Sequence, residues 1–115
     1  MLVAEQLKEG NPLRTAGMAF AREYEGKYGA GTRSPFAAAP YDAYRLIENA
    51  ARIALRKAQP GTEAFRSALR DGLEQTRDLR TTATIYAYSP TDHVGLDQRS
   101  QVLAVVKDGK WTLLD

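Results

Sequence analysis

The sequence predicts an α+β fold in which three helices are followed by a small antiparallel sheet with a C-terminal hairpin. Apolar residues recur at helical spacing as far as residue 76, and after Arg80 the chain becomes rich in Thr, Ile and Tyr. Asp108 and Gly109 then stand between two short apolar runs, which is typical of a two-residue hairpin turn. At 115 residues we expect one modest core and treat residues 1–115 as a single unit.

Each predicted helix begins at a residue whose side-chain oxygen can accept a hydrogen bond from an unpaired first-turn N–H. Asn11 and Ser34 are each followed by Pro, which has no N–H to leave unpaired, and Thr62 opens the third helix. Gly29 offers a left-handed stop for the first helix. The predicted helices cover residues 12–28, 35–58 and 63–76.

The second predicted helix contains a proline and an alanine-rich stripe. Pro40 has no N–H to bond to the carbonyl of Phe36, so this helix either begins near Pro40 or has a kinked start. The apolar stripe over residues 43–58 permits close approach of another element, and a mixed polar face lies opposite it.

The predicted strands cover residues 82–88, 102–107 and 110–114. In the last of them, Trp111 and Leu113 share one face because side chains alternate along a strand. The polar segment over residues 89–100 is longer than an ordinary hairpin turn, so it is either a functional loop or an insertion with local structure.

Charge and composition exclude several classes of function. The 16 basic and 14 acidic side chains give a net charge of +2, and acids fall among the arginines on the same predicted helices. That pattern is typical of solvated helix faces, so we expect no nucleic-acid partner. The chain has no Cys, and from its sequence we expect neither a membrane span nor an export signal.

Asp92, His93 and Asp97 are the one grouping with an imidazole and nearby carboxylates. A zinc site needs further ligands that a chain with one His and no Cys does not offer. We therefore expect Asp92 to cap a turn and His93 to bond to backbone. No serine has a nucleophile context, so the sequence predicts no catalytic residue, no metal, no cofactor and no enzyme.

Phe36 precedes the buried stripe of the second predicted helix. An aromatic side chain there could either staple the helix start or line a cleft, and periodicity alone favours the staple.

Five stretches, in order, resemble the C-terminal region of the type 1 periplasmic solute-binding proteins, in particular the branched-chain amino acid ABC transporter family and its aromatic-acid-binding relatives. The stretches are NPLRTAGMAFAREYEGKYGAG, SPFAAAPYDAYRLIENAARIAL, PGTEAFRSALRDGLE, YSPTDHVGLDQRSQVL and VKDGKWTLL. They cover nearly the whole chain. The resemblance implies a fragment of the family's α/β fold.

In that family, two lobes close over a small solute, and the periplasmic protein passes it to an ABC permease. The resemblance implies a ligand that is an amino acid or an aromatic acid, with Phe36 lining the cleft and Tyr41 as a second ligand-binding residue. The groups that hold the ligand carboxylate and amino group lie upstream in the family. The pocket of this chain is therefore expected to be incomplete.

An isolated fragment would expose apolar surface, and we expect it to form a homodimer. The alternative hypothesis is a stand-alone α+β interaction module that dimerises through the alanine stripe and the hairpin without binding a ligand.

Overall fold

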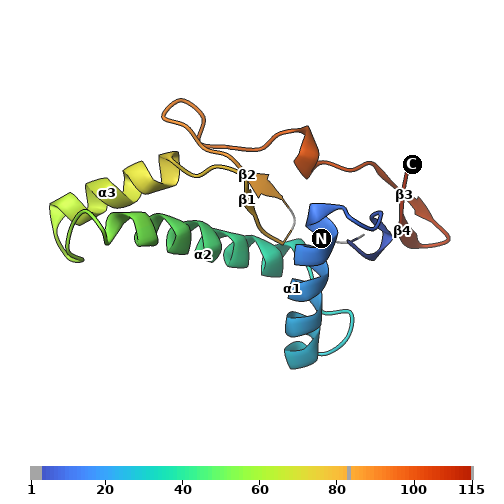
Figure 1. Ribbon diagram of the computed structural model, residues 1–115. Helices are drawn as coiled ribbons and strands as arrows, with labels where there is room; N and C mark the ends of the chain where they lie inside the picture. Colours follow the sequence, from blue (N-terminus) through green and yellow to red (C-terminus); the bar gives the residue numbers. More distant parts are fainter. Residues whose placement is uncertain (1–3, 83, 115) are drawn as a thin grey trace.

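The computed structural model describes residues 4–82 and 84–114, and Figure 1 shows their arrangement. The predicted α+β class is confirmed, but the predicted small sheet is two separate two-stranded antiparallel sheets, β1–β2 and β3–β4. The elements in order are η1 (Ala4–Gln6), α1 (Pro12–Tyr28), α2 (Pro35–Ala54), α3 (Glu63–Glu74), β1 (Leu79–Arg80), β2 (Ile85–Tyr86), η2 (Gln98–Ser100), β3 (Ala104–Lys107) and β4 (Lys110–Leu113).

The three helices begin where the capping residues predict. A side-chain oxygen accepts a first-turn N–H in each case: Asn11 from Leu13 (2.9 Å), Ser34 from Ala37 (3.2 Å) and Thr62 from Phe65 (3.1 Å). Gly29 follows the last residue of α1 with a φ of 101° and donates its N–H to the carbonyl of Glu25. Local sequence therefore fixes where these helices start and where α1 ends.

The helix α2 begins at Pro35 and contains Pro40, so a start near Pro40 is wrong. The helix ends at Ala54 instead of residue 58, because the N–H of Lys57 bonds to the carbonyl of Ala54 and the chain tightens into a turn. In the same way α3 ends at Glu74 rather than at residue 76.

The helix α3 runs back along the C-terminal half of α2 (Figure 1). The two backbones come closest at Gly72, where an added Cβ would lie 2.9 Å from the carbonyl oxygen of Ala50. Ala50 and Ala54 are 0% exposed. The predicted alanine stripe therefore does permit a close approach, and the element that approaches is α3.

The strand predicted over 82–88 is much shorter in the structure. Of the described residues in this range, only β2 is a strand, and it pairs with β1, which the sequence pattern did not predict. The N–H of Thr81 bonds to the carbonyl of Thr84 (3.0 Å), which makes a turn where the prediction had extended chain. Ala83 lies outside the described residues. The Thr-rich composition gave β propensity, but pairing decides which residues form a strand.

The hairpin β3–β4 turns at Asp108 and Gly109, which both have positive φ (50° and 73°), as a tight hairpin turn requires. β3 begins at Ala104, two residues later than predicted. The side chain of Gln6 donates to the carbonyl of Trp111 (2.9 Å) and accepts from the N–H of Leu113 (2.8 Å). The N-terminal segment thereby fixes β4 beside it.

A small apolar cluster joins the N-terminal segment to both sheets. Leu7, Leu13 and Ile85 are buried in it, and Leu113 of β4 packs against them. Because side chains alternate along a strand, Trp111 lies on the same face of the hairpin as Leu113, yet Trp111 is half-exposed.

The chain is elongated. Its extents are 54 × 31 × 22 Å and its radius of gyration is 16.4 Å, whereas a compact domain of similar length has a radius of gyration of about 13 Å. Among the residues that the structure describes, thirteen large hydrophobic side chains are exposed. Within residues 4–82 and 84–114, no helix is both long and apolar enough to cross a membrane. This shape and surface are typical of one portion of a larger fold.

Candidate functional site

Two apolar pockets lie on the described surface of the chain. The hairpin pocket, of about 500 Å³, lies between the start of α2, β2 and the hairpin, and its lining includes Pro35, Asp42, Thr84, Tyr86, Ser100 and Trp111. The helix-pair pocket, of about 370 Å³, is lined by residues of α2, α3 and the following loop: Ala43, Leu46, Ile47, Arg70, Leu73, Glu74, Tyr88 and His93.

The hairpin pocket has a few polar groups in an apolar wall. Asp42 is 3% exposed, and its Oδ1 accepts both the N–H of Thr82 (2.9 Å) and the hydroxyl of Thr82 (2.8 Å). The buried hydroxyl of Thr84 has no hydrogen-bond partner among the described residues. Mostly apolar walls with a few placed polar groups are typical of sites for small organic ligands.

The pKa of Tyr86, which lines this pocket, is shifted by its surroundings. Burial raises the pKa of its hydroxyl, and the negative charge of Asp42 raises it further. Tyr86 therefore stays neutral at physiological pH and can donate a hydrogen bond.

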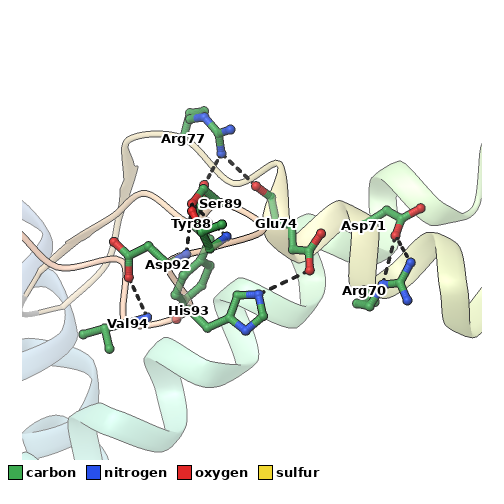
Figure 2. Close-up of polar contacts among 10 residues, drawn as sticks. Arg70, Asp71, Glu74, Arg77, Tyr88, Ser89, Asp92, His93 and Val94 are labelled. Atoms are coloured by element: carbon green, nitrogen blue, oxygen red, sulfur yellow. Dashed lines mark hydrogen bonds and ion pairs between the residues drawn. The ribbon is translucent and has the colours of Figure 1, made fainter.

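The rim of the helix-pair pocket is polar. His93 Nε2 lies 3.2 Å from Oε1 of Glu74, which joins the loop after β2 to α3 (Figure 2). Burial raises the pKa of the Tyr88 hydroxyl in the same loop. Leu46, Ile47 and Leu73 form the apolar floor beneath this rim.

The loop over residues 89–97 has local structure, one of the two predicted alternatives. Oδ1 of Asp92 accepts from the N–H groups of Val94 (2.9 Å) and Gly95 (3.0 Å), so Asp92 caps a turn as predicted. The predicted backbone bond of His93 is wrong, because the loop folds back over α3 and brings the imidazole to Glu74. Arg77 reinforces this fold by donating to the carbonyl of Tyr88 (Figure 2).

Asp97 is not brought together with Asp92 and His93. Its carboxylate accepts from the guanidinium of Arg99 (2.7 Å), which also binds Asp78 (2.9 Å). The hydrogen bonds from Arg99 hold the pKa of Asp97 below its ordinary value. Among the residues that the structure describes, no three His, Cys, Asp or Glu side chains gather to hold a metal ion.

The two predicted ligand-binding residues lie at the N-terminal end of α2. Phe36 is 89% exposed, so it does not staple the helix start. The ring of Tyr41 lies 5.3 Å from that of Phe20 in α1, and its hydroxyl accepts a long hydrogen bond from Arg45 (3.5 Å). Phe36 thus presents a free aromatic face, while Tyr41 joins α1 to α2.

Sequence reasoning missed Asp42. A signal for it was present: Asp42 lies four residues after Ala38 and four before Leu46, so it occupies the buried face of α2. An acidic residue on an otherwise apolar face predicts a buried partner, because an unpaired buried charge is costly.

Solved structures that this chain is similar to include extracellular ligand-binding receptors. One from Rhodopseudomonas palustris is 38% identical, with a TM-score of 0.89 over 99% of this chain. Another, from Rhodopseudomonas palustris HaA2, is 34% identical, with a TM-score of 0.90 over 99% of this chain. Each alignment covers 32% of the receptor. The sequence matches no protein-family profile and no curated protein at a significant level.

By fold and sequence, the chain is therefore similar to one portion of an extracellular ligand-binding receptor, and it spans about a third of the length of such receptors. This confirms the resemblance to part of a type 1 periplasmic binding protein.

Proposed function

We propose that this chain works as part of a two-lobed periplasmic receptor that binds an amino acid or an aromatic acid and delivers it to an ABC permease. It catalyses no reaction and holds no cofactor in this role. One observation carries the proposal: 99% of the chain aligns with an extracellular ligand-binding receptor at 38% identity. Capture would occur when the lobes close over the solute, as hinged binding proteins do.

The geometry at the start of α2 supports a wall of a ligand cleft. Pro35 lines the hairpin pocket, and the neighbouring Phe36 presents an aromatic ring that is 89% exposed. A large apolar side chain gains most from being covered, so an exposed ring beside an apolar pocket fits contact with an apolar or aromatic solute. Phe36 is the first residue of the proposed site.

Tyr41 is the second residue of the proposed site. Its packing on Phe20 holds the first turns of α2 against α1, and its hydroxyl accepts a bond from Arg45 within α2. A rigid support for Phe36 would reduce the conformational entropy that its side chain loses when the ligand binds.

The test is calorimetric titration of the full-length receptor that contains this chain with branched-chain and aromatic acids. We expect saturable binding of one of these classes, and the absence of binding to all of them would contradict the proposed ligand. The Asp42→Asn receptor is a useful companion, because it distinguishes a solute that needs the buried charge of the hairpin pocket from one that needs only its apolar walls.

The alternative is a module that dimerises through the alanine stripe and the hairpin without binding a ligand. The part of the stripe that faces α3 is not free for a second copy, because Ala50 and Ala54 are 0% exposed, whereas Ile47 is 53% exposed and Val106 of the hairpin is 58% exposed.

A further inference from the structure

The helix α2 has an apolar face that no described part of the chain covers. Tyr44, Ile47, Ala51 and Leu55 recur at intervals of three and four residues, so their side chains lie along one line. We call these four residues the α2 stripe. Tyr44, Ile47 and Leu55 are 60%, 53% and 57% exposed.

The stripe differs from both other faces of α2. The face toward α3 is buried, with Leu46, Ala50 and Ala54 at most 8% exposed. On the solvent side, Glu48 binds Arg52 (2.7 Å) and Arg45 (3.3 Å), as charged residues on a hydrated helix surface commonly do. The stripe has neither a covering element nor a charged side chain. Its chemistry is therefore that of an interface.

The stripe continues into the helix-pair pocket. Ile47 belongs to both, and Leu73 and Tyr88 extend the apolar surface from α2 to α3 and the loop. His93 Nε2 and Oε1 of Glu74 bind each other at the rim, so these two atoms are paired without a partner (Figure 2). A partner that packs along the stripe can insert an apolar side chain into this pocket.

We infer that the α2 stripe and the helix-pair pocket form an internal interface, covered by the remaining two thirds of a ligand-binding receptor. The lengths support this occupant over a second copy, because the chain keeps the receptor fold at a TM-score of 0.89 while covering 32% of the receptor. Most of that receptor lies outside this segment, and an exposed apolar face on the segment is where it would pack. The inference rests on the proposed function only in placing the chain within a receptor.

The chain has no cysteine, so a single introduced thiol reports on this face. Ile47→Cys places the thiol on the stripe. Ser67→Cys, at an exposed position of α3, is the matched control. Maleimide labelling rates are measured for both variants in the isolated chain and in the full-length receptor, each corrected by the rate in denaturant to remove differences in intrinsic thiol reactivity.

We expect both thiols to react quickly in the isolated chain. In the receptor, the Ile47→Cys thiol should react slower by about tenfold or more because the receptor must open locally to expose it, while the Ser67→Cys thiol should be unchanged. Equal reactivity of the two thiols in the receptor would overturn the inference. Protection of Ile47→Cys in the isolated chain, together with a dimeric mass by light scattering, would also overturn it in favour of a second copy.

The labelling result and the titration can fail separately. A receptor that binds none of the acids but protects the Ile47→Cys thiol contradicts the proposed ligand and supports the interface. A receptor that binds an acid and leaves that thiol reactive contradicts the interface alone.

Discussion

Asp42 in α2 and Thr82, 40 residues later, are joined by two hydrogen bonds to a single carboxylate oxygen. The bonds tie the N-terminal half of α2 to the turn between β1 and β2. Both residues are nearly inaccessible, at 3% and 1% exposure. Because this pair links the helices to the first sheet beside the hairpin pocket, it determines the position of the pocket wall.

Replacing Asp42 by Ala should lower the free energy of unfolding by roughly 3 kcal/mol, because two buried donors of Thr82 lose a charged acceptor. Asp42→Asn keeps an acceptor oxygen and should cost about 1 kcal/mol. Urea unfolding measures both variants. Equal, small losses for the two variants would show that the pair contributes little to the fold.

Gly72→Ala should destabilise the chain by about 1–3 kcal/mol, because α2 and α3 must separate to admit the new methyl group. An added Cβ at Gly72 lies 2.9 Å from the backbone oxygen of Ala50, which cannot move as a side chain does. Gly26→Ala in α1 is the control, since nothing lies within 4 Å of its Cβ position. That control should be stabilised by about 1 kcal/mol. Thermal unfolding midpoints of the two variants are compared with that of the wild type. A higher midpoint for Gly72→Ala would contradict the close approach of α2 and α3.

Phe36→Ala should weaken solute binding by the full-length receptor by roughly tenfold or more, since a buried aromatic contact is worth about 1.5–3 kcal/mol. The unfolding midpoint of the isolated chain should stay unchanged, because Phe36 is 89% exposed. Val94→Ala removes another exposed apolar side chain, 69% exposed, and should leave affinity unchanged. Unchanged affinity of the Phe36→Ala receptor would contradict the place of Phe36 in the ligand cleft.

His93→Ala should change stability by less than about 1 kcal/mol, because exposed ion pairs contribute little. The imidazole is 69% exposed and has Glu74 as its side-chain partner. Solute affinity should also stay the same, since we propose no role in binding or catalysis for His93. A large loss of solute affinity or of any other measured activity would show that His93 has a functional role.

Asp97→Asn should lower stability at neutral pH and have progressively less effect in acid. Arg99 lowers the pKa of Asp97 in the folded chain below the ordinary value of 3.8. A carboxylate whose folded pKa is depressed contributes stability above its unfolded pKa, and this contribution is lost as pH falls through the folded value. Unfolding midpoints of wild type and variant should therefore converge below pH 3.8. A difference that does not vary with pH would contradict the charge-based origin.

Sequence by itself determined the features that depend on neighbouring residues. The caps at Asn11, Ser34 and Thr62 act on N–H groups two or three residues away, and the Asp108–Gly109 turn closes over adjacent strands. Hydrogen bonds between residues so close in the sequence depend on residue type and order, so a sequence pattern predicts them. The five stretches of sequence, in their order, also indicate the resemblance to solute-binding proteins.

Only the tertiary structure decided which distant groups meet. No spacing rule pairs Asp42 with Thr82 or Glu74 with His93, because these contacts depend on how α2 and α3 cross and where the following loop returns. The same packing sorted the apolar residues of α2 into two sets. Ala50 is buried because Gly72 lets α3 approach it, whereas Ile47 on the adjoining face stays exposed because α3 does not reach it.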